Sequence, residues 1–330
     1  MTIYDLAELA GASSSAVSAV LNGSWKKRRI GTQLAEKILR IADEQGYTLN
    51  QQASLLRRSK STMIGMVIPK YDNRYFGSIA ELFESMARER GLFPIITCTN
   101  RDPELEIQAA RAMLSYQVSQ VISTGATYPD EISKICSVKG VPTFNLDLPG
   151  TLAPSVITDN YSGAKEITLR IFNNCKKKLG CTKPLIFIGG RISDHNTMER
   201  LRGFKDAHQQ LGIEIIETNI LTCGYSPEKA EVSLKDFIAK GGDFRTGLFV
   251  NSTISLEGVM RWMASSGHIG ERQPAIGCFD WDPFVVLLGH DIVMVRQDVS
   301  SMLKALFALI DAEEQSHRII EIPPIFPVIE

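Results

Sequence analysis

No apolar run in the sequence is long enough to cross a bilayer, since polar residues interrupt every hydrophobic stretch before about 18 residues. The first residues also lack the apolar core of a signal peptide, because polar and charged side chains recur from Tyr4 onward. These two absences predict a cytoplasmic protein that does not contact the membrane.

Cysteine is sparse, and the six that occur include no CxxC pair, which argues against disulfides and a zinc site. The glycine motifs of nucleotide-binding proteins are missing, both GxGxxG after the first expected strand and GxxxxGK[ST] anywhere. Among only five histidines, no metal-ligand spacing or nucleophile–base pair stands out. The sequence therefore predicts no metal, no cofactor and no enzymatic activity.

The 330 residues allow about two domains and a small module. Hydrophobic content of 44% and charged content of 22% are typical of a globular protein. The formal net charge of −1 is unevenly spread, because residues 1–60 carry nine Lys or Arg against five Asp or Glu. Residues 1–60 therefore have a net charge of +4, and the rest of the chain has a net charge of −5. A basic N-terminal module is expected if these sixty residues contact nucleic-acid phosphates.

Residues 2–22 have the pattern of two short helices joined by a tight turn. Thr2 and Ser13 suit the two N-caps, and Gly11 suits the left-handed turn between the helices. The expected inner faces comprise Leu6, Leu9, Ala10, Val17, Val20 and Leu21. The expected outer face of the second helix comprises Ser14, Ser15, Ala16, Ser18 and Ala19. An ordinary helical hairpin is the alternative to a helix-turn-helix, whose second helix enters the DNA major groove.

The same stretch, TIYDLAELAGASSSAVSAVLN, is similar to the opening T-I-x-D-V-A-x-x-A-G-V-S-x-x-T-V-S-x-V-L-N of the lactose repressor/galactose repressor (LacI/GalR) family of bacterial transcription regulators. The chain has Ala16 and Ala19 where that family often has Thr and Arg. The resemblance implies operator binding, but these two differences prevent the operator sequence from being carried over.

A basic loop, SWKKRRIG, precedes a third expected helix that Thr32 would cap and Gly46 would end. This loop is longer than is usual in the family and resembles the fructose and sucrose repressor branch. Residues 50–60 resemble the family's hinge helix, which orders on operator DNA and wedges a leucine into the minor groove; Leu56 matches that leucine. A flexible linker is the alternative for this segment.

The expected DNA-binding residues are Thr2, Tyr4, Ser13, Ser14, Ser15, Ser18, Asn22, Lys27, Arg28, Asn50, Ala53 and Leu56.

From Thr62 onward, short apolar runs alternate with helical stretches. Expected strands are 64–69, 94–98, 118–123, 143–146, 185–189, 247–250 and 275–279, and expected helices are 76–90, 103–116, 161–173, 199–211, 255–265 and 299–314. Alternation of this kind predicts an α/β body of doubly wound parallel sheets with helices on both faces. Ligands of such sheets bind beyond the carboxyl ends of the strands.

Polar, charged and aromatic residues recur at these strand ends. Carboxylates and amides bind sugar hydroxyls, arginine forms paired hydrogen bonds, and aromatic rings cover CH faces. The expected effector-binding residues are Asp72, Tyr75, Phe76, Asp147, Asn196, Arg200, Ser252, Asp280 and Gln297. A cap or turn is the alternative role for any single one of them.

The body also resembles the two-lobed, periplasmic-binding-protein-like body of sugar-responsive repressors. Sucrose operon repressors are the most similar group, through VITD (156–159), FIGG (187–190), ERLRGF (199–204) and VRQD (295–298). In relatives, the residues that match Arg200 and Asp280 bind the effector. Fructose-type relatives have an arginine after the residue that matches Asp147, whereas this chain has Leu148, so a neutral sugar is expected to act at least as well as its phosphate ester.

The expected organisation is a helix-turn-helix domain (1–49), a hinge (50–61), a first lobe (62–158 with 291–320) and a second lobe (159–290 with 321–330). The expected function is repression of a carbohydrate operon, for sucrose or fructose, by a homodimer or tetramer that binds double-stranded operator DNA. Its effector would be sucrose, fructose or a sugar phosphate. A sugar-binding transport protein and a sugar-modifying enzyme are the alternatives, and the basic module and missing motifs argue against them.

Overall fold

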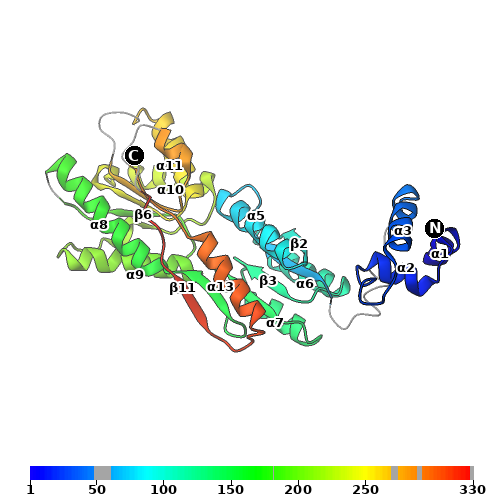
Figure 1. The fold of residues 1–330 in the computed structure, drawn as a ribbon. Coiled ribbons are helices and arrows are strands. Elements are labelled where there is room, and N and C mark those ends of the chain that lie inside the picture. The colour runs from blue at the N-terminus through cyan, green and yellow to red at the C-terminus, as the bar shows by residue number, and fades with distance from the viewer. Residues whose placement is uncertain (48–60, 181, 269–273, 288–291, 328–330) are drawn as a thin grey trace. The chain divides into compact units, whose positions relative to one another are not determined.

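The computed structural model describes residues 1–47, 61–180, 182–268, 274–287 and 292–327. The chain divides into two compact units, residues 1–61 and 62–330 (Figure 1). In the described part of the chain, no helix is long and apolar enough to span a bilayer.

The first unit contains α1 (Ile3–Ala10), α2 (Ser14–Leu21) and α3 (Thr32–Glu44). Thr2 forms a capping box with Asp5, and Gly11 takes a left-handed φ of 65°, so the expected helix–turn–helix is confirmed. Ser13 caps α2 by accepting a hydrogen bond from the Ala16 amide. The three helices bury one small core, which includes Leu6, Val17, Val20 and Ile38.

Three details of this unit differ from expectation. Leu9 is 53% exposed, and Ala7 takes its place in the core. Ala19 is buried at 3% exposure instead of facing outward. Gly31, not Thr32, is the N-cap of α3, and no side chain caps that end. Helices this short expose whichever side their neighbours leave uncovered.

The second unit contains two separate sheets, and every strand pairing in them is parallel. The first sheet has the order β11 (Ile319–Ile322), β5 (Ser155–Thr158), β4 (Thr143–Leu146), β3 (Val121–Thr124), β1 (Met63–Ile68) and β2 (Phe93–Cys98). The second has the order β10 (Ile292–Val295), β9 (Ile276–Phe279), β8 (Leu248–Val250), β6 (Ile186–Ile188) and β7 (Ile220–Leu221).

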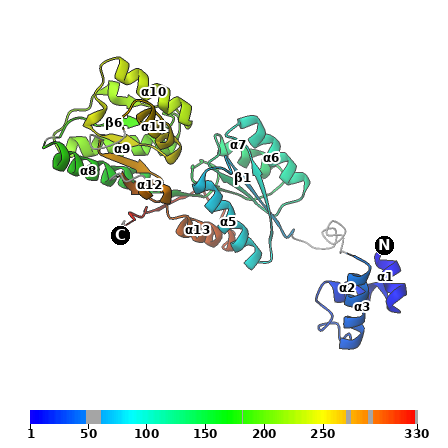
Figure 2. The same ribbon diagram turned by 90° about the horizontal axis from the view of Figure 1, so that it is seen from above.

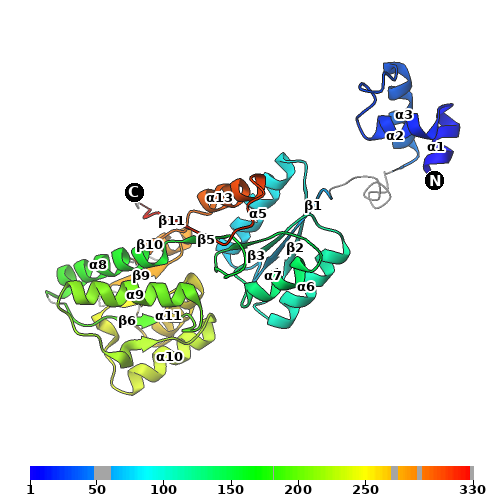
Figure 3. The same ribbon diagram turned by 90° about the horizontal axis from the view of Figure 1, so that it is seen from below.

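Helices cover both faces of each sheet, as expected for a doubly wound fold. On the first sheet, α5 (Arg74–Glu89) and α13 (Val299–Asp311) pack on one face, and α6 (Pro103–Ser115) and α7 (Pro129–Ser137) on the other (Figure 3). On the second sheet, α8 (Asn160–Leu179) and α9 (His195–Gln210) lie opposite α10 (Pro227–Ala239) and α11 (Thr253–Ser265) (Figure 2). A short helix, α12 (Pro283–Leu287), follows β9.

The strand pairings shift two of the expected lobe boundaries. The sequence assigns residues 291–320 to the first lobe, but β10 pairs with β9 in the second sheet. It assigns residues 321–330 to the second lobe, but β11 pairs with β5 in the first sheet through Ile322. A short apolar strand fits either sheet equally well, so only its partner decides where it belongs. The expected hinge, with Asn50, Ala53 and Leu56, lies outside the described residues.

Candidate functional site

The ends of β4 and β9 each place a buried carboxylate between the two lobes. Asp147 follows β4 and is 4% exposed, and Asp280 follows β9 and is 8% exposed. Parallel strands bring their carboxyl ends to one edge of a sheet, where loops from helices on both faces also meet. The site is therefore built from strand ends, as the sequence predicts.

Asp147 accepts hydrogen bonds from both lobes through the same oxygen. The Tyr75 hydroxyl, on α5, donates to Oδ1 at 3.0 Å, and the Asn196 amide, on α9, donates to Oδ1 at 3.1 Å. Burial raises the pKa of Asp147 to about 6, although the Arg101 and Arg200 charges oppose that rise. Burial and the neighbouring Asp147 charge raise the pKa of Tyr75 well above its ordinary value, so its hydroxyl remains a donor.

Arg200 anchors the second lobe's half of the site. Its side chain is 3% exposed, and its guanidinium lies 3.7 Å from the centre of the Phe279 ring. Its Nε donates to Asn160 Oδ1 at 2.8 Å, and its Nη1 donates to the Asn251 carbonyl oxygen at 2.6 Å. Asn160 in turn donates to Asn196 Oδ1 at 3.0 Å. A buried chain of hydrogen bonds therefore runs from Arg200 to the Asp147 carboxylate of the first lobe.

Asp280 belongs to a second chain of hydrogen bonds. Gln297 Nε2 donates to Asp280 Oδ1 at 2.6 Å, and the Thr158 hydroxyl donates to Gln297 Oε1 at 2.6 Å. Burial raises the pKa of Asp280, and the Arg200 charge and the Gln297 hydrogen bond oppose that rise. Gln297 thus connects a carboxylate at the end of the second sheet with Thr158 at the end of β5 in the first.

Seven of the nine expected effector residues gather at this place: Tyr75, Phe76, Asp147, Asn196, Arg200, Asp280 and Gln297. Asp72 instead is exposed and forms an ion pair with Lys70 at 3.9 Å. Ser252 is buried, and its hydroxyl accepts from the Ser255 amide as the N-cap of α11. The hydroxyl of Ser252 therefore already has a structural partner. Effector contact by any of the nine residues stays a prediction.

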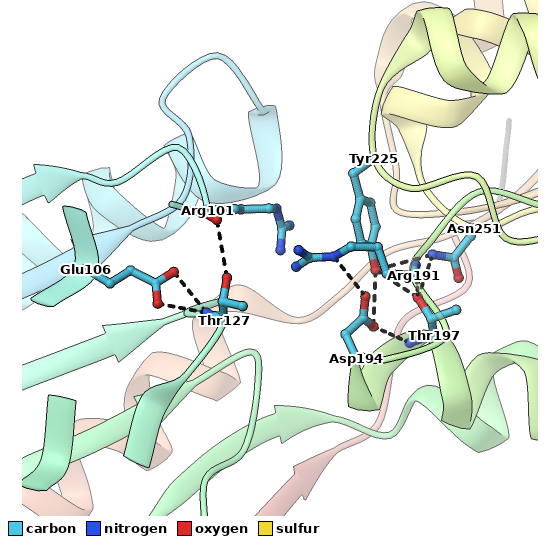
Figure 4. A network of polar contacts seen from close by, with 8 residues as sticks. All are labelled: Arg101, Glu106, Thr127, Arg191, Asp194, Thr197, Tyr225 and Asn251. Atoms are coloured by element: carbon cyan, nitrogen blue, oxygen red, sulfur yellow. Dashed lines mark hydrogen bonds and ion pairs between the residues drawn. The ribbon is translucent and has the colours of Figure 1, made fainter. Parts of the chain in front are cut away.

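A second polar group at the same cleft is centred on Tyr225 (Figure 4), and sequence reasoning missed Tyr225, Thr197 and Arg101 in it. The Tyr225 hydroxyl lies 3.0 Å from the Thr197 hydroxyl and 3.4 Å from both Asp194 Oδ1 and Asn251 Nδ2. The Arg101 guanidinium, from the first lobe, lies 4.6 Å from the centre of the Tyr225 ring. Arg101 comes three residues after β2 ends at Cys98, so a wider search beyond each strand end would have found it.

The first unit presents the expected DNA-binding residues in three ways. Thr2 and Ser13 cap helices, so their side-chain oxygens are partly engaged. Tyr4 is 69% exposed, and Lys27 and Arg28 are exposed in the loop between α2 and α3. On α2, Ser15 is exposed, Ser14 and Ser18 are half-buried, and Asn22 Nδ2 donates to the Ser18 carbonyl oxygen at 2.8 Å.

Comparisons with known proteins agree with this architecture. Residues 64–288 match the family model described as "Periplasmic binding protein domain". The chain is 68% identical over 191 residues to the ribitol operon repressor of Klebsiella aerogenes, an alignment covering 58% of this chain and 71% of that protein. It is 29% identical to the sucrose operon repressor of Klebsiella pneumoniae, with 90% of this chain and 87% of that protein covered.

Among solved structures, the lac repressor dimer bound to operator and the anti-inducer ONPF superposes with a TM-score of 0.79. It is 18% identical, and the superposition covers 98% of this chain and 96% of that one. This likeness supports the fold, while the curated relatives are repressors and not enzymes. The chain is therefore a member of the LacI/GalR family, a DNA-binding transcriptional repressor whose body is a periplasmic binding protein domain.

Proposed function

We propose that this repressor controls an operon for the use of a small polyol or sugar, and that a polyhydroxylated effector binds between the two lobes. The observation that carries the proposal is the buried hydrogen-bond chain from Arg200 through Asn160 and Asn196 to Asp147. The carboxylate, amide and guanidinium groups in this chain can exchange hydrogen bonds with one another for hydrogen bonds with the hydroxyls of a polyol, so that none is left without a partner.

The relatives refine the expected class of effector. The sequence favours sucrose or fructose, but the relative at 68% identity is named for the ribitol operon and the sucrose repressor is only 29% identical. We therefore favour a five-carbon polyol or the ketopentose obtained by its oxidation. The part of the ligand that lies near Asp147, Asp280 and Arg200 should be uncharged, because the charges of these side chains already oppose one another.

The proposal includes a homodimer that binds a pseudo-palindromic operator. A groove of about 590 Å³ is lined by the start of α5, through Asn73 and Arg74, and by the start of α11, through Thr253 and Ile254. It spans both lobes, and Arg74 and Asp282 form an ion pair across it at 3.3 Å. A second copy of the chain bound in this groove would shift when the lobes close. The two copies of the first unit (residues 1–61), here called headpieces, would then bind half-sites about one helical turn apart.

The test measures operator binding by the purified full chain, using fluorescence anisotropy of a labelled DNA fragment from its own operon. Ribitol, ribulose, sucrose and fructose are titrated in turn. We expect a five-carbon compound to change operator affinity by about tenfold, within the usual range of allosteric coupling. No change with ribitol, ribulose, sucrose or fructose would contradict the proposal. Footprinting should protect both half-sites, and protection of one asymmetric half-site would contradict the dimer.

A further inference from the structure

Two arginines from different lobes point toward each other at the outer end of the cleft (Figure 4). Arg101 belongs to the loop between β2 and α6 and holds a left-handed φ of 58°. Arg191 follows β6 and the paired glycines Gly189 and Gly190. Their guanidinium carbons lie 4.6 Å and 5.9 Å from the centre of the same ring, that of Tyr225. The Tyr225 ring therefore contacts two cations that come from opposite lobes.

The two guanidinium groups have few close partners among the described residues, although the Arg101 charge acts on Asp147 and Asp280. Asp194 approaches Arg191 only to 3.9 Å, and the buried Arg191 Nε makes no hydrogen bond in the described part of the chain. Among the residues that the structure describes, no carboxylate lies within 4.0 Å of the Arg101 guanidinium. Two guanidinium groups that face one another repel, and the repulsion grows where water is partly excluded.

The charged groups differ between the two ends of the cleft. Its inner end has the two buried carboxylates of Asp147 and Asp280, on which the charges of both Arg101 and Arg200 act. Its outer end, beside the Tyr225 ring, has the Arg101 and Arg191 guanidinium groups and the Asp194 carboxylate, which lies 3.9 Å from Arg191 Nε. Hydroxyl groups suit the inner end, because carboxylates accept their hydrogen bonds, and an anion suits the outer end.

We propose that Arg101, Arg191 and Tyr225 form a subsite for an anionic group, a phosphate monoester or a carboxylate. The inference rests on the proposed function, since that group would be carried by the polyhydroxylated effector. An anion between two arginines of opposite lobes screens their repulsion and favours closure of the cleft. This reverses the expectation drawn from Leu148, which is buried at 7% exposure and belongs to the packing of the first lobe.

Calorimetric titration of the full chain tests the subsite with matched compounds: ribitol, ribitol 5-phosphate, ribonate and inorganic phosphate. We expect a charged compound to bind about tenfold to a hundredfold more tightly than ribitol, as hydrogen bonds to charged groups allow. In Arg191→Gln, the ratio of charged to neutral affinity should fall close to one. Arg202→Gln is the control, because Arg202 lies on α9, the helix that follows the Arg191 loop, is exposed and pairs with Glu199, and it should keep the wild-type ratio.

The outcomes distinguish a free anion from one carried by the effector, and they distinguish failure of the subsite from failure of the proposed function. Inorganic phosphate that tightens ribitol binding in the wild type, but not in Arg191→Gln, would support the subsite with a free anion as its ligand. Equal binding of ribitol and both charged compounds by the wild type would overturn the subsite and leave the proposed function intact. An unchanged ratio in Arg191→Gln would also overturn it, provided that thermal unfolding shows the variant folded. Failure of all the neutral and charged polyols to bind would count against the proposed function instead.

Discussion

Asp147 and Asp280 occupy equivalent positions in the two lobes: each directly follows a central strand and holds a left-handed backbone, with φ of 73° and 75°. Non-glycine residues seldom adopt this conformation, and in buried positions it persists only where the surrounding structure imposes it. The shared geometry turns both carboxylates into the space between the lobes, where each accepts an amide hydrogen bond. Strain at matched positions in two sheets supports a shared role in holding a ligand.

Effector affinity should depend on pH through Asp147. Burial raises the pKa of this carboxyl from 3.8 to about 6, so it becomes neutral as the pH falls below that value. A ligand whose hydroxyls donate to the ionised form should lose up to about tenfold in affinity for each pH unit below 6. Calorimetry with the best-binding compound between pH 5 and 8 measures this. Asp147→Asn should bind more weakly and without that pH dependence, and a flat wild-type profile would exclude the role.

The free energy of unfolding should decrease in acid because of His208. This ring is enclosed by Phe172 and Phe204, accepts from the Leu185 amide at 3.1 Å, and has its pKa lowered by burial to about 4. The unfolded chain takes up the proton near pH 6.5, whereas the folded chain resists until about 4, so stability is lost as the pH falls between those values. Between pH 7 and pH 5 the loss is on the order of 2 kcal/mol.

Urea unfolding at pH 7 and pH 5 measures that loss. His208→Gln should be less stable at pH 7 but should lose less on going to pH 5. The matched control is His317→Gln, since His317 is exposed whereas His208 is fully buried. A wild type whose unfolding free energy is the same at both pH values would exclude this account of His208.

The headpiece shows how far local sequence signals reach. The caps at Thr2 and Ser13 and the turn at Gly11 depend on neighbours a few residues away, so the sequence predicts them correctly. The inner faces depend on contacts with the rest of the unit, and Leu9 and Ala19 differ from the predicted faces. An eight-residue helix has too few turns for its periodicity to fix which face is covered.

The site divides in the same way. The strand ends predict Asp147 and Asp280, because parallel topology alone brings them to one edge of each sheet. Arg200 lies within α9 and is expected from the family resemblance instead. Arg101 and Tyr225 lie on the loops that follow β2 and β7, and their contact depends on how the two lobes close. No local pattern encodes that closure. The lobe assignments of β10 and β11 depend on strand pairing in the same way.

Leu56→Ala should weaken operator binding by about tenfold or more while leaving affinity for random DNA nearly unchanged. A wedge between base steps exists only in the ordered, bent complex, so its loss spares the attraction to phosphate. This residue lies outside the described range, and the prediction depends on the sequence resemblance alone. Competition assays with operator and random fragments measure the two affinities. An equal loss on both would reject the wedge.

The loop between α2 and α3 should contribute salt-dependent affinity. Backbone hydrogen bonds fold this loop into turns; for example, the Ile30 amide donates to the Trp25 carbonyl oxygen at 3.0 Å. Lys27 and Arg28 are exposed in the loop. Replacing both with Ala should reduce the slope of log affinity against log salt by about 2, or about 0.9 for each lost phosphate contact. Arg40→Ala on α3, whose partner is Glu44, is the control. An unchanged slope in the double variant would show that the loop does not meet phosphate.

The effector response of Arg200→Ala tests the central claim most directly. Operator binding is followed by fluorescence anisotropy, with and without the compound that modulates the wild type. Truncation removes the donors to Asn160 and the Asn251 carbonyl and leaves Asp147 and Asp280 without their nearest buried cation. The account predicts a protein that still binds operator through its separate headpiece but no longer responds to the compound, whereas Arg202→Ala responds normally. An Arg200→Ala protein that responds with wild-type affinity would contradict the placement of the effector between the lobes.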